Sequence, residues 1–155
     1  MPQLSLHSPI GPLTLTEEDD KIISLDWGWG RDQTETPMLC AARDWLDTWF
    51  DDPKAAGDFP FPLEPIFGTD YQKRVWNALC AIPVGTVKTY KELAQDVGGS
   101  ARSVGQAVGR NPIPILIPCH RIVSQTGLGG YSGDGGIDDK RWLLNLEGAP
   151  IPSGG

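Results

Sequence analysis

Apolar and polar residues alternate in three short runs near the start of the chain. Alternation with a period of two is typical of strands that bury one face, so the pattern predicts strands over 3–8, 13–16 and 22–27, the first two forming a hairpin. The acidic run 17–20 is expected to be the turn before the third strand. Apolar residues then recur at helical spacing over 37–50, which predicts an amphipathic helix.

Residues 53–66 interrupt this order because they are rich in proline and show little periodicity. We expect them to be a linker or a tethered surface segment. The sequence therefore predicts two domains, an α/β domain over 1–66 and a mainly α domain over 67–155.

The second domain contains three signals for the start of a helix. Thr69 and Thr89 are each followed three residues later by Gln or Glu, the spacing of a capping box, and Ser100 is expected to cap a third helix over 101–110. Two short helices joined by a glycine-containing turn are typical of a helix-turn-helix. An ordinary helical hairpin has the same spacing, and the pattern favours neither.

Ala101, Gly105 and Gly109 recur every four residues along this third helix. A glycine inside a helix costs about 1 kcal/mol relative to alanine, so we expect another backbone to come close to the stripe, either a second helix or a nucleic acid. Arg102 projects beside the stripe. Small residues with one arginine suit the DNA minor groove, where a side chain can also wedge into the base stack.

The formal net charge of −7 is unevenly distributed along the chain. Residues 1–66 hold 4 Lys and Arg against 13 Asp and Glu, whereas residues 67–155 hold 9 against 7 and residues 68–121 hold 7 against 3. Net negative charge argues against a nucleic-acid partner, but a locally basic segment can form a phosphate-binding face. The acidic residues of the first half can equally serve only to solvate it.

The cysteine and histidine counts argue against several classes of site. Cys40, Cys80 and Cys119 are too widely spaced for a disulfide framework or a thiolate clamp, and with only His7 and His120 available we expect no structural metal. No apolar run is long enough to span a membrane, and the N-terminus lacks a secretion signal. We therefore expect a cytoplasmic protein in a reducing compartment.

Cys119 is the clearest candidate for a chemically reactive residue. It follows the apolar run 113–117, which predicts a buried strand, and it directly precedes His120. A thiolate is a strong nucleophile, and a neighbouring imidazole can take its proton. Adjacent Cys and His residues are weak evidence alone, because most lone cysteines are small buried hydrophobes and His120 can equally be a structural hydrogen bonder.

The surroundings of Cys119 match one protein family, in order along the chain. The matching stretches are 75–76, 82–85, 90–94, 101–105, 111–112, 118–121, 130–133 and 140–144. Through them the segment 69–147 resembles the O6-alkylguanine-DNA alkyltransferases, which are direct-reversal DNA repair proteins. The resemblance implies a ribonuclease-H-like α/β N-terminal domain and a winged-helix-like C-terminal domain that contains the helix-turn-helix and carries the active site.

The resemblance also implies a reaction. Cys119 would accept the alkyl group of O6-alkylguanine, with O4-alkylthymine as a further candidate substrate, after the base is flipped out of duplex DNA. The thioether product is stable, so each molecule would act once, as a suicide methyltransferase. No cofactor or metal is implied, and the expected partner is double-stranded DNA, bound through its minor groove by a monomer that associates with the nucleoid.

The resemblance assigns catalytic roles to five residues. His120 would deprotonate Cys119 through a water molecule, and Glu147 would hold the imidazole. Asn111 would order the turn before the active-site strand. Tyr90 would supply a hydrogen bond or a proton to the guanine ring, since a phenol is a weak acid matched to an anionic leaving group.

Further residues would bind the DNA and the extruded base. Arg102 would fill the base stack after the target base leaves, which offsets part of the cost of extrusion. The segment 134–139 is longer than the commonest family pattern, which leaves the width of the base pocket open. The guanine pocket would be formed by Ile122, Tyr131, Ser132 and Gly133, and the other DNA contacts by Tyr71, Tyr90, Lys91, Ala101, Ser103, Gly105 and Arg110.

Two other functions are weighed against this one. A non-catalytic DNA-damage-binding module of the alkyltransferase-like kind would keep the fold but replace the cysteine, so Cys119 argues against it. A cysteine hydrolase or thiol redox sensor would need neither Arg102 nor Tyr90, so their presence argues against that class. Taken singly, Tyr90 can be a packing aromatic and Arg102 a solvated surface residue.

Overall fold

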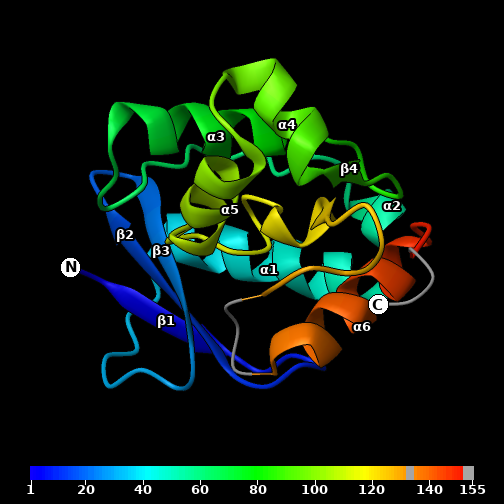
Figure 1. Cartoon of the computed structure of the whole chain (residues 1–155). Coiled ribbons are helices and arrows are strands. Elements are labelled where there is room, and N and C mark those ends of the chain that lie inside the picture. Colours follow the sequence, from blue (N-terminus) through cyan, green and yellow to red (C-terminus); the bar gives the residue numbers. More distant parts are fainter. Residues whose placement is uncertain (132–134, 152–155) are drawn as a thin grey trace. The chain divides into compact units, whose positions relative to one another are not determined.

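The computed structural model describes residues 1–131 and 135–151. The chain divides into two compact units, Met1–Phe67 and Gly68–Gly155 (Figure 1). Within the described ranges, every helix is too short or too polar to cross a membrane. In the same ranges, no group of three or more His, Cys, Asp or Glu side chains is placed to hold a metal ion.

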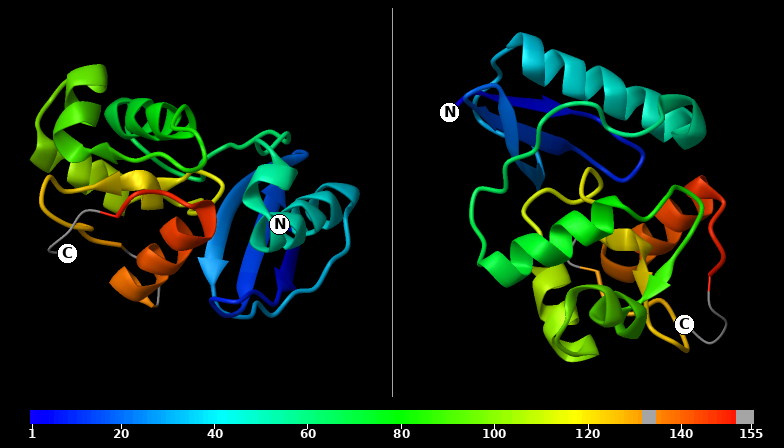
Figure 2. Two further views of the ribbon diagram at one scale, coloured as in Figure 1. Left: turned by 90° about the vertical axis from the view of Figure 1, so that its right-hand side faces the viewer. Right: turned by 90° about the horizontal axis from the view of Figure 1, so that it is seen from above.

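The first unit is a three-stranded antiparallel sheet with one long helix. Strands β1 (Gln3–Leu6), β2 (Leu13–Glu18) and β3 (Lys21–Trp27) pair in that order. Helix α1 (Pro37–Asp51) lies along one face of the sheet (Figures 1 and 2). The predicted hairpin, third strand and helix are confirmed, although β1 ends two residues earlier than expected.

Leucines fill the space between the sheet and α1. Leu15 of β2 lies opposite Leu4 of β1 and Leu25 of β3, so one row of side chains crosses the three strands. Leu39 and Leu46 of α1 meet them and are fully buried. Burying a leucine contributes roughly 1.5–3 kcal/mol, so this row is enough to fix which face of the sheet points inward.

The predicted acidic turn is wrong in its extent. Glu17 and Glu18 belong to β2, and Glu17 is buried after a register shift that follows Thr16. Only Asp19 and Asp20 form the turn, with φ of 51° and 63°. A two-residue hairpin needs left-handed backbone at both positions, and Asp tolerates that conformation better than Glu.

The proline-rich segment 53–66 is not a free linker. It begins with a short helix, α2 (Pro53–Ala56), whose first amides are capped by the carboxylate of Asp52. Ile22 of β3 then exchanges two backbone hydrogen bonds with the segment, 3.0 and 2.8 Å long. Phe59 packs edge-on against Trp45 of α1, with 5.1 Å between ring centroids. Of the two expectations, the tethered surface segment is therefore the one observed.

The second unit is mainly helical, and its first three helices pack on one another (Figures 1 and 2). A two-stranded parallel sheet joins the residues before the second helix to those after Cys119. The elements are α3 (Asp70–Cys80), β4 (Lys88–Thr89), α4 (Tyr90–Val97), α5 (Ala101–Gly109), the 3₁₀ turn η1 (Cys119–Arg121), β5 (Ile122–Val123) and α6 (Gly136–Glu147).

The three predicted helix starts are confirmed. The side chains of Thr69, Thr89 and Ser100 each accept a hydrogen bond from the amide three residues later, and the side chain there returns a bond to the capping residue. Trp76 of α3 donates from Nε1 to the carbonyl of Ala107 on α5, 2.8 Å away. Local capping sets where the helices begin, and this buried bond fixes how α5 packs on α3.

The apolar run 113–117 is buried, but the prediction of a strand is wrong. The backbone turns back on itself, because Ile117 donates to the carbonyl of Ile113 at 2.8 Å and Ile115 has φ of 70°. Prolines before, within and after the run lack the N–H that a strand ladder requires. The run therefore forms a buried turn that delivers Cys119 into a 3₁₀ turn.

Candidate active site

A cavity of about 230 Å³ opens beside Cys119. The thiol residue is only 3% exposed, so the cavity is the space through which a reactant reaches the sulfur. Two glycines of α5 form part of its wall. A Cβ at Gly105 would lie 3.8 Å from the ring of Tyr90, and one at Gly109 would meet nothing within 4 Å. The lining residues are Tyr90, Gly105, Val108, Gly109, Cys119, Gly130 and Tyr131.

The glycine stripe therefore borders a cavity rather than a second helix. Helix α5 packs against α3 and α4, with Val104 and Ala107 buried, while the buried Val108 also lines the cavity. Missing side chains at Gly105 and Gly109 leave room next to the sulfur.

Asn111 holds the turn that places Cys119. Its amide nitrogen donates to the carbonyl of Ile117 at 2.9 Å, and its side-chain oxygen accepts from the amide of Ile113 at 2.9 Å. Burial raises the pKa of the Cys119 thiol, while a hydrogen bond with Asn111 and the charge of Lys140 oppose that rise. The predicted ordering role of Asn111 thus has a geometric basis, with a buried turn in place of a strand.

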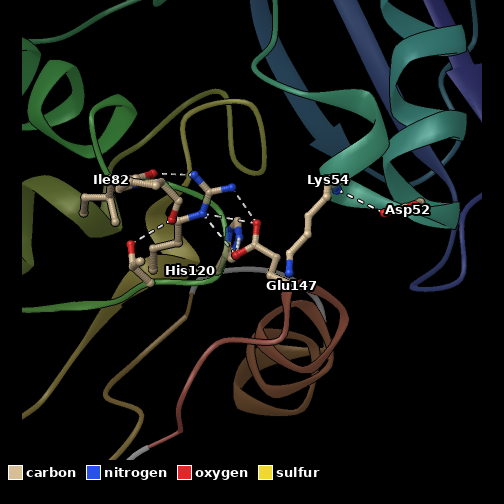
Figure 3. Close-up of polar contacts among 8 residues, drawn as sticks. Asp52, Lys54, Ile82, His120 and Glu147 are labelled. Carbon is tan, nitrogen blue, oxygen red and sulfur yellow. Dashed lines mark hydrogen bonds and ion pairs between the residues drawn. The ribbon is translucent and has the colours of Figure 1, made fainter.

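Behind the thiol lies a buried polar cluster of His120, Glu147 and Arg121. His120 Nε2 lies 3.1 Å from Glu147 Oε1, and the two side chains point toward each other (Figure 3). Arg121 donates from Nε to both carboxylate oxygens, at 3.0 and 3.1 Å, and from its terminal nitrogen at 2.5 Å. Its remaining nitrogen donates to the carbonyl of Ile82, 2.6 Å away.

Burial and charge act in opposite directions on this cluster. Burial lowers the pKa of His120 and is countered by the hydrogen bond and charge of Glu147, while Arg121 and Lys140 lower that pKa further. Burial would raise the pKa of Glu147, but its bonds to His120 and Arg121 hold that pKa below its usual range. The cluster therefore favours a neutral imidazole beside an ionised carboxylate.

Tyr90 and Lys140 hold the backbone of Gly130 from two sides. The amide of Gly130 bonds to the Tyr90 hydroxyl, and its carbonyl accepts from Lys140 Nζ at 3.0 Å. Burial raises the pKa of Tyr90, so the phenol stays protonated. Lys140 is fully buried, and burial lowers its pKa from 10.5 to about 8, with the charge of Cys119 acting against that shift.

Gly129 lets this loop pass close to Tyr90. It has φ of 75°, and a Cβ there would lie 2.7 Å from the Tyr90 hydroxyl oxygen. We expect Gly129→Ala to lower the free energy of unfolding by about 1–2 kcal/mol or more, because a left-handed non-glycine residue alone costs that much. Urea unfolding measures the change. Gly130→Ala is the matched control, since its Cβ would meet nothing within 4 Å, and equal losses in the two variants would contradict the argument.

The sequence was compared with known proteins. The DNA-binding domain of 6-O-methylguanine DNA methyltransferase matches residues 70–149. A methylated-DNA–protein-cysteine methyltransferase from Metallosphaera sedula is 40% identical over 147 residues, which cover 93% of this chain and 91% of that protein. The chain belongs to the methylated-DNA–protein-cysteine methyltransferase family. The relative from Mycobacterium bovis is 39% identical over 162 residues, covering 96% of this chain and 93% of its own.

Solved structures of this methyltransferase family share the fold along the whole chain. The crystal structure of Mycobacterium tuberculosis OGT in complex with DNA has a TM-score of 0.82 and 38% sequence identity, and the match covers 97% of this chain and 96% of that one. The crystal structure of Mycobacterium tuberculosis O6-methylguanine methyltransferase has the same TM-score at 36% identity, covering 98% and 95%. The second unit of this family member is thus a helical DNA-binding domain, as the resemblance implied.

The structure brings together the predicted catalytic residues of this methyltransferase. Cys119 and Tyr90 line the cavity, His120 follows Cys119 and pairs with Glu147, and Asn111 bonds the turn that precedes Cys119. Three predicted pocket residues are not among the described residues that line the cavity. Ile122 is buried at the start of β5, where its amide donates to the carbonyl of Cys119. Ser132 and Gly133 fall outside the described residues.

The residues predicted to contact DNA form two groups. Ala101, Arg102, Lys91 and Arg110 are exposed on α4, on α5 or at the end of α5, and Gly105 lines the cavity. The side chains of Tyr71 and Ser103 instead form hydrogen bonds within the second unit. The Tyr71 hydroxyl donates to the carbonyl of Gly98 at 2.9 Å and lies 2.9 Å from Ser103 Oγ, so it ties α3 to the turn between α4 and α5.

Sequence reasoning missed two buried cations, Arg121 and Lys140. Each had a signal in the sequence. Arg121 continues a buried apolar stretch in which a solvated arginine is out of place. Lys140 shares the buried face of α6 with Leu143, Leu144 and Glu147, at helical spacing, so charged residues stand at both ends of an apolar stripe.

Proposed function

We propose that this protein repairs O6-alkylguanine in duplex DNA by transferring the alkyl group to the sulfur of Cys119, once per molecule. The observation that carries the proposal is a cysteine that is 3% exposed at a cavity of about 230 Å³, with the His120–Glu147 pair directly behind it. A cavity of this size with few polar groups suits a flat heterocycle held against the nucleophile.

The chemistry requires a thiolate, an aligned carbon and a proton for the departing base. The sulfur of Cys119 forms a bond to the alkyl carbon as the bond from that carbon to guanine O6 breaks. The thiol proton passes through a water molecule to His120. With Nε2 directed at the carboxylate of Glu147, Nδ1 is the nitrogen that accepts the proton. The thioether product is stable, so each molecule transfers one alkyl group.

Tyr90 stabilises the departing guanine. A guanine that loses its alkyl group carries negative charge, which a hydrogen bond or proton from the Tyr90 hydroxyl neutralises. Burial keeps the pKa of this phenol raised, so Tyr90 holds its proton at neutral pH. Tyr131 would wall the guanine, and the carbonyls of Cys119 and Ile122 would accept from its exocyclic amine.

For DNA binding we propose that α4 and α5 act as a helix-turn-helix of winged-helix type, with α5 at the minor groove. Ala101, Arg102 and Gly105 present small side chains and one cation at its exposed and cavity-lining positions. Lys91 and Arg110 would contact phosphates. Tyr71 and Ser103 would act on DNA mainly by fixing the turn before α5, and the first unit would be a ribonuclease-H-like companion domain.

The test is a mass measurement on the intact protein after incubation with duplex DNA bearing O6-methylguanine. We expect one methyl group per chain, located on Cys119 by peptide mapping. Cys119→Ala should gain none, while Cys40→Ser and Cys80→Ser, which remove the other free thiols, should gain one each. If the protein bound the lesion without any gain of mass, it would be a DNA-damage-binding module and not a methyltransferase. A methyl group on another residue would refute Cys119 as the acceptor.

Arg102→Ala is expected to slow transfer from duplex O6-methylguanine by roughly 10- to 100-fold, because extruding a paired base costs a few kcal/mol and the arginine fills the gap that is left. Transfer from a single-stranded oligonucleotide should change much less, since no partner base must be left behind. Single-turnover rates on both substrates measure the effect. Arg110→Ala, at the other end of α5, should slow transfer from the two substrates by the same factor. If Arg102→Ala also slowed transfer from both by the same factor, the proposed role of Arg102 would be refuted.

A further inference from the structure

Arg121 is the residue that joins the buried polar cluster to the rest of the unit. Its guanidinium bonds both oxygens of Glu147 and also the carbonyl of Ile82, which lies beyond the end of α3. His120 uses one of those same carboxylate oxygens (Figure 3). All three side chains are buried, with His120 at 0%, Glu147 at 2% and Arg121 at 7% exposure, so water screens their charges little.

Counting charges in this cluster shows what the guanidinium does. With a neutral imidazole, Arg121 and Glu147 cancel each other. Adding a proton to His120 then leaves one uncompensated positive charge in a buried site, which is costly. Without Arg121, the carboxylate of Glu147 would instead have the imidazolium as its only counter-ion within the cluster, and protonation would neutralise the site. Arg121 therefore acts together with burial, which is the larger effect, to favour an uncharged His120 at rest.

We propose that Arg121 is a positioning residue that neutralises and fixes Glu147, and thereby keeps His120 uncharged and ready to accept the proton of Cys119. The proposal deepens the proposed function and rests on it, because a histidine that already carries a proton cannot deprotonate a thiol. Bidentate contact also fixes the carboxylate plane, so the oxygen that faces His120 cannot rotate away.

The other charged groups around His120 do not replace Arg121. Glu147 and Lys140 face it from α6, and Cys119 and Arg121 flank it on η1, while Tyr131 is a buried neutral phenol at the same cavity. Burial lowers the pKa of His120, Glu147 raises it, and both Arg121 and Lys140 lower it. Of Arg121 and Lys140, Arg121 is the cation that hydrogen-bonds the carboxylate, so its removal releases the charge of Glu147 toward the imidazole.

During the reaction the arrangement keeps charge balanced. Proton transfer from the thiol to the neutral imidazole creates a thiolate and an imidazolium together, so the net charge of the site does not change. The imidazolium then lies beside a carboxylate whose position Arg121 already fixes. After sulfur takes the alkyl carbon, the proton on His120 is available to the departing guanine through water, and the site returns to its resting charge.

The experiment compares Arg121→Met and Arg121→Lys with the parent protein. Single-turnover methyl transfer from duplex O6-methylguanine is followed between about pH 5.5 and pH 9, and the protonation of His120 is followed separately by nitrogen-15 NMR of its ring. In Arg121→Met we expect the acid limb to move up by about one pH unit or more. The rate at pH 6 should then fall by about tenfold or more, while the rate at pH 9 approaches that of the parent. Arg121→Lys, which keeps the charge, should lie between them.

If Arg121→Met slowed transfer by the same factor at every pH and left the NMR titration midpoint of His120 unchanged, the proposal would be overturned. Arg121 would then have only a structural role, through its bond to the carbonyl of Ile82. An NMR titration that moves while the rate profile does not would support the control of His120 but refute His120 as the base, so the two failures can be told apart. If Arg121→Met does not fold, Glu147→Gln gives the opposite prediction. There the unbalanced guanidinium should lower the titration midpoint of His120, and a midpoint that stays or rises would contradict the charge argument.

Discussion

Replacing His120 by Gln is expected to slow methyl transfer to Cys119 by about 100- to 10,000-fold at pH 7, the usual contribution of a general base. Burial raises the pKa of the thiol, so at neutral pH most molecules hold a thiol that cannot attack carbon. Gln keeps a polar side chain beside Glu147 but cannot accept a proton. Rapid-quench measurement of single-turnover transfer from labelled duplex DNA gives the rate.

The pH dependence separates loss of a base from loss of structure. The rate of His120→Gln should rise toward that of the parent only well above the ordinary thiol pKa of ~8.5, because burial raises the pKa of Cys119 and the thiol must then ionise without help. His7→Gln is the matched control, because the other histidine of the chain lies in the first unit, stacked on Trp29. A His120→Gln rate within tenfold of the parent at pH 7 would show that His120 is not the base.

Features of this fold that depend on neighbouring residues were predictable from the sequence. The helix starts at Thr69, Thr89 and Ser100 follow from capping residues three positions apart, and the three strands follow from alternation. Both signals act within one turn or one hairpin, where the backbone has few alternatives. The two short helices on either side of the glycine turn could therefore be predicted from the sequence.

Features that depend on distant contacts were not predictable in this way. The run 113–117 is apolar enough for a strand, yet Asn111 and the surrounding prolines turn it, and alternation cannot reveal that. The bond from the Tyr71 hydroxyl to the carbonyl of Gly98 spans 27 residues, and no local pattern reveals it. Arg121 escaped notice because its partner, Glu147, lies 26 residues further along the chain.

Lys140→Met is expected to make the thiolate of Cys119 scarcer at neutral pH, because the buried ammonium is a nearby positive charge that opposes the effect of burial on this thiol. Methionine has a similar length and no charge. Alkylation of Cys119 by iodoacetamide, followed by mass spectrometry, should be about tenfold slower at pH 7, and the difference should shrink as pH rises past about 8 and Lys140 of the parent loses its proton. Lys91→Met, which removes an exposed lysine of α4, should leave the alkylation rate at pH 7 unchanged.

Stability gives an independent check on the same lysine. In the unfolded chain Lys140 keeps its proton up to its ordinary pKa of 10.5, but in the folded protein it releases it near pH 8. Between those values the unfolded state binds more protons, so the free energy of unfolding of the parent rises with pH, by at most about 3 kcal/mol at ~1.36 kcal/mol per pKa unit. Lys140→Met lacks this gain, so its stability relative to the parent should fall from pH 7 to pH 10.5.

The raised pKa values of Tyr90 and Tyr131 affect both proteins alike and cancel in that difference. A difference that stays constant with pH would mean that Lys140 is not held as a strained buried cation, and its influence on Cys119 would lose its physical basis.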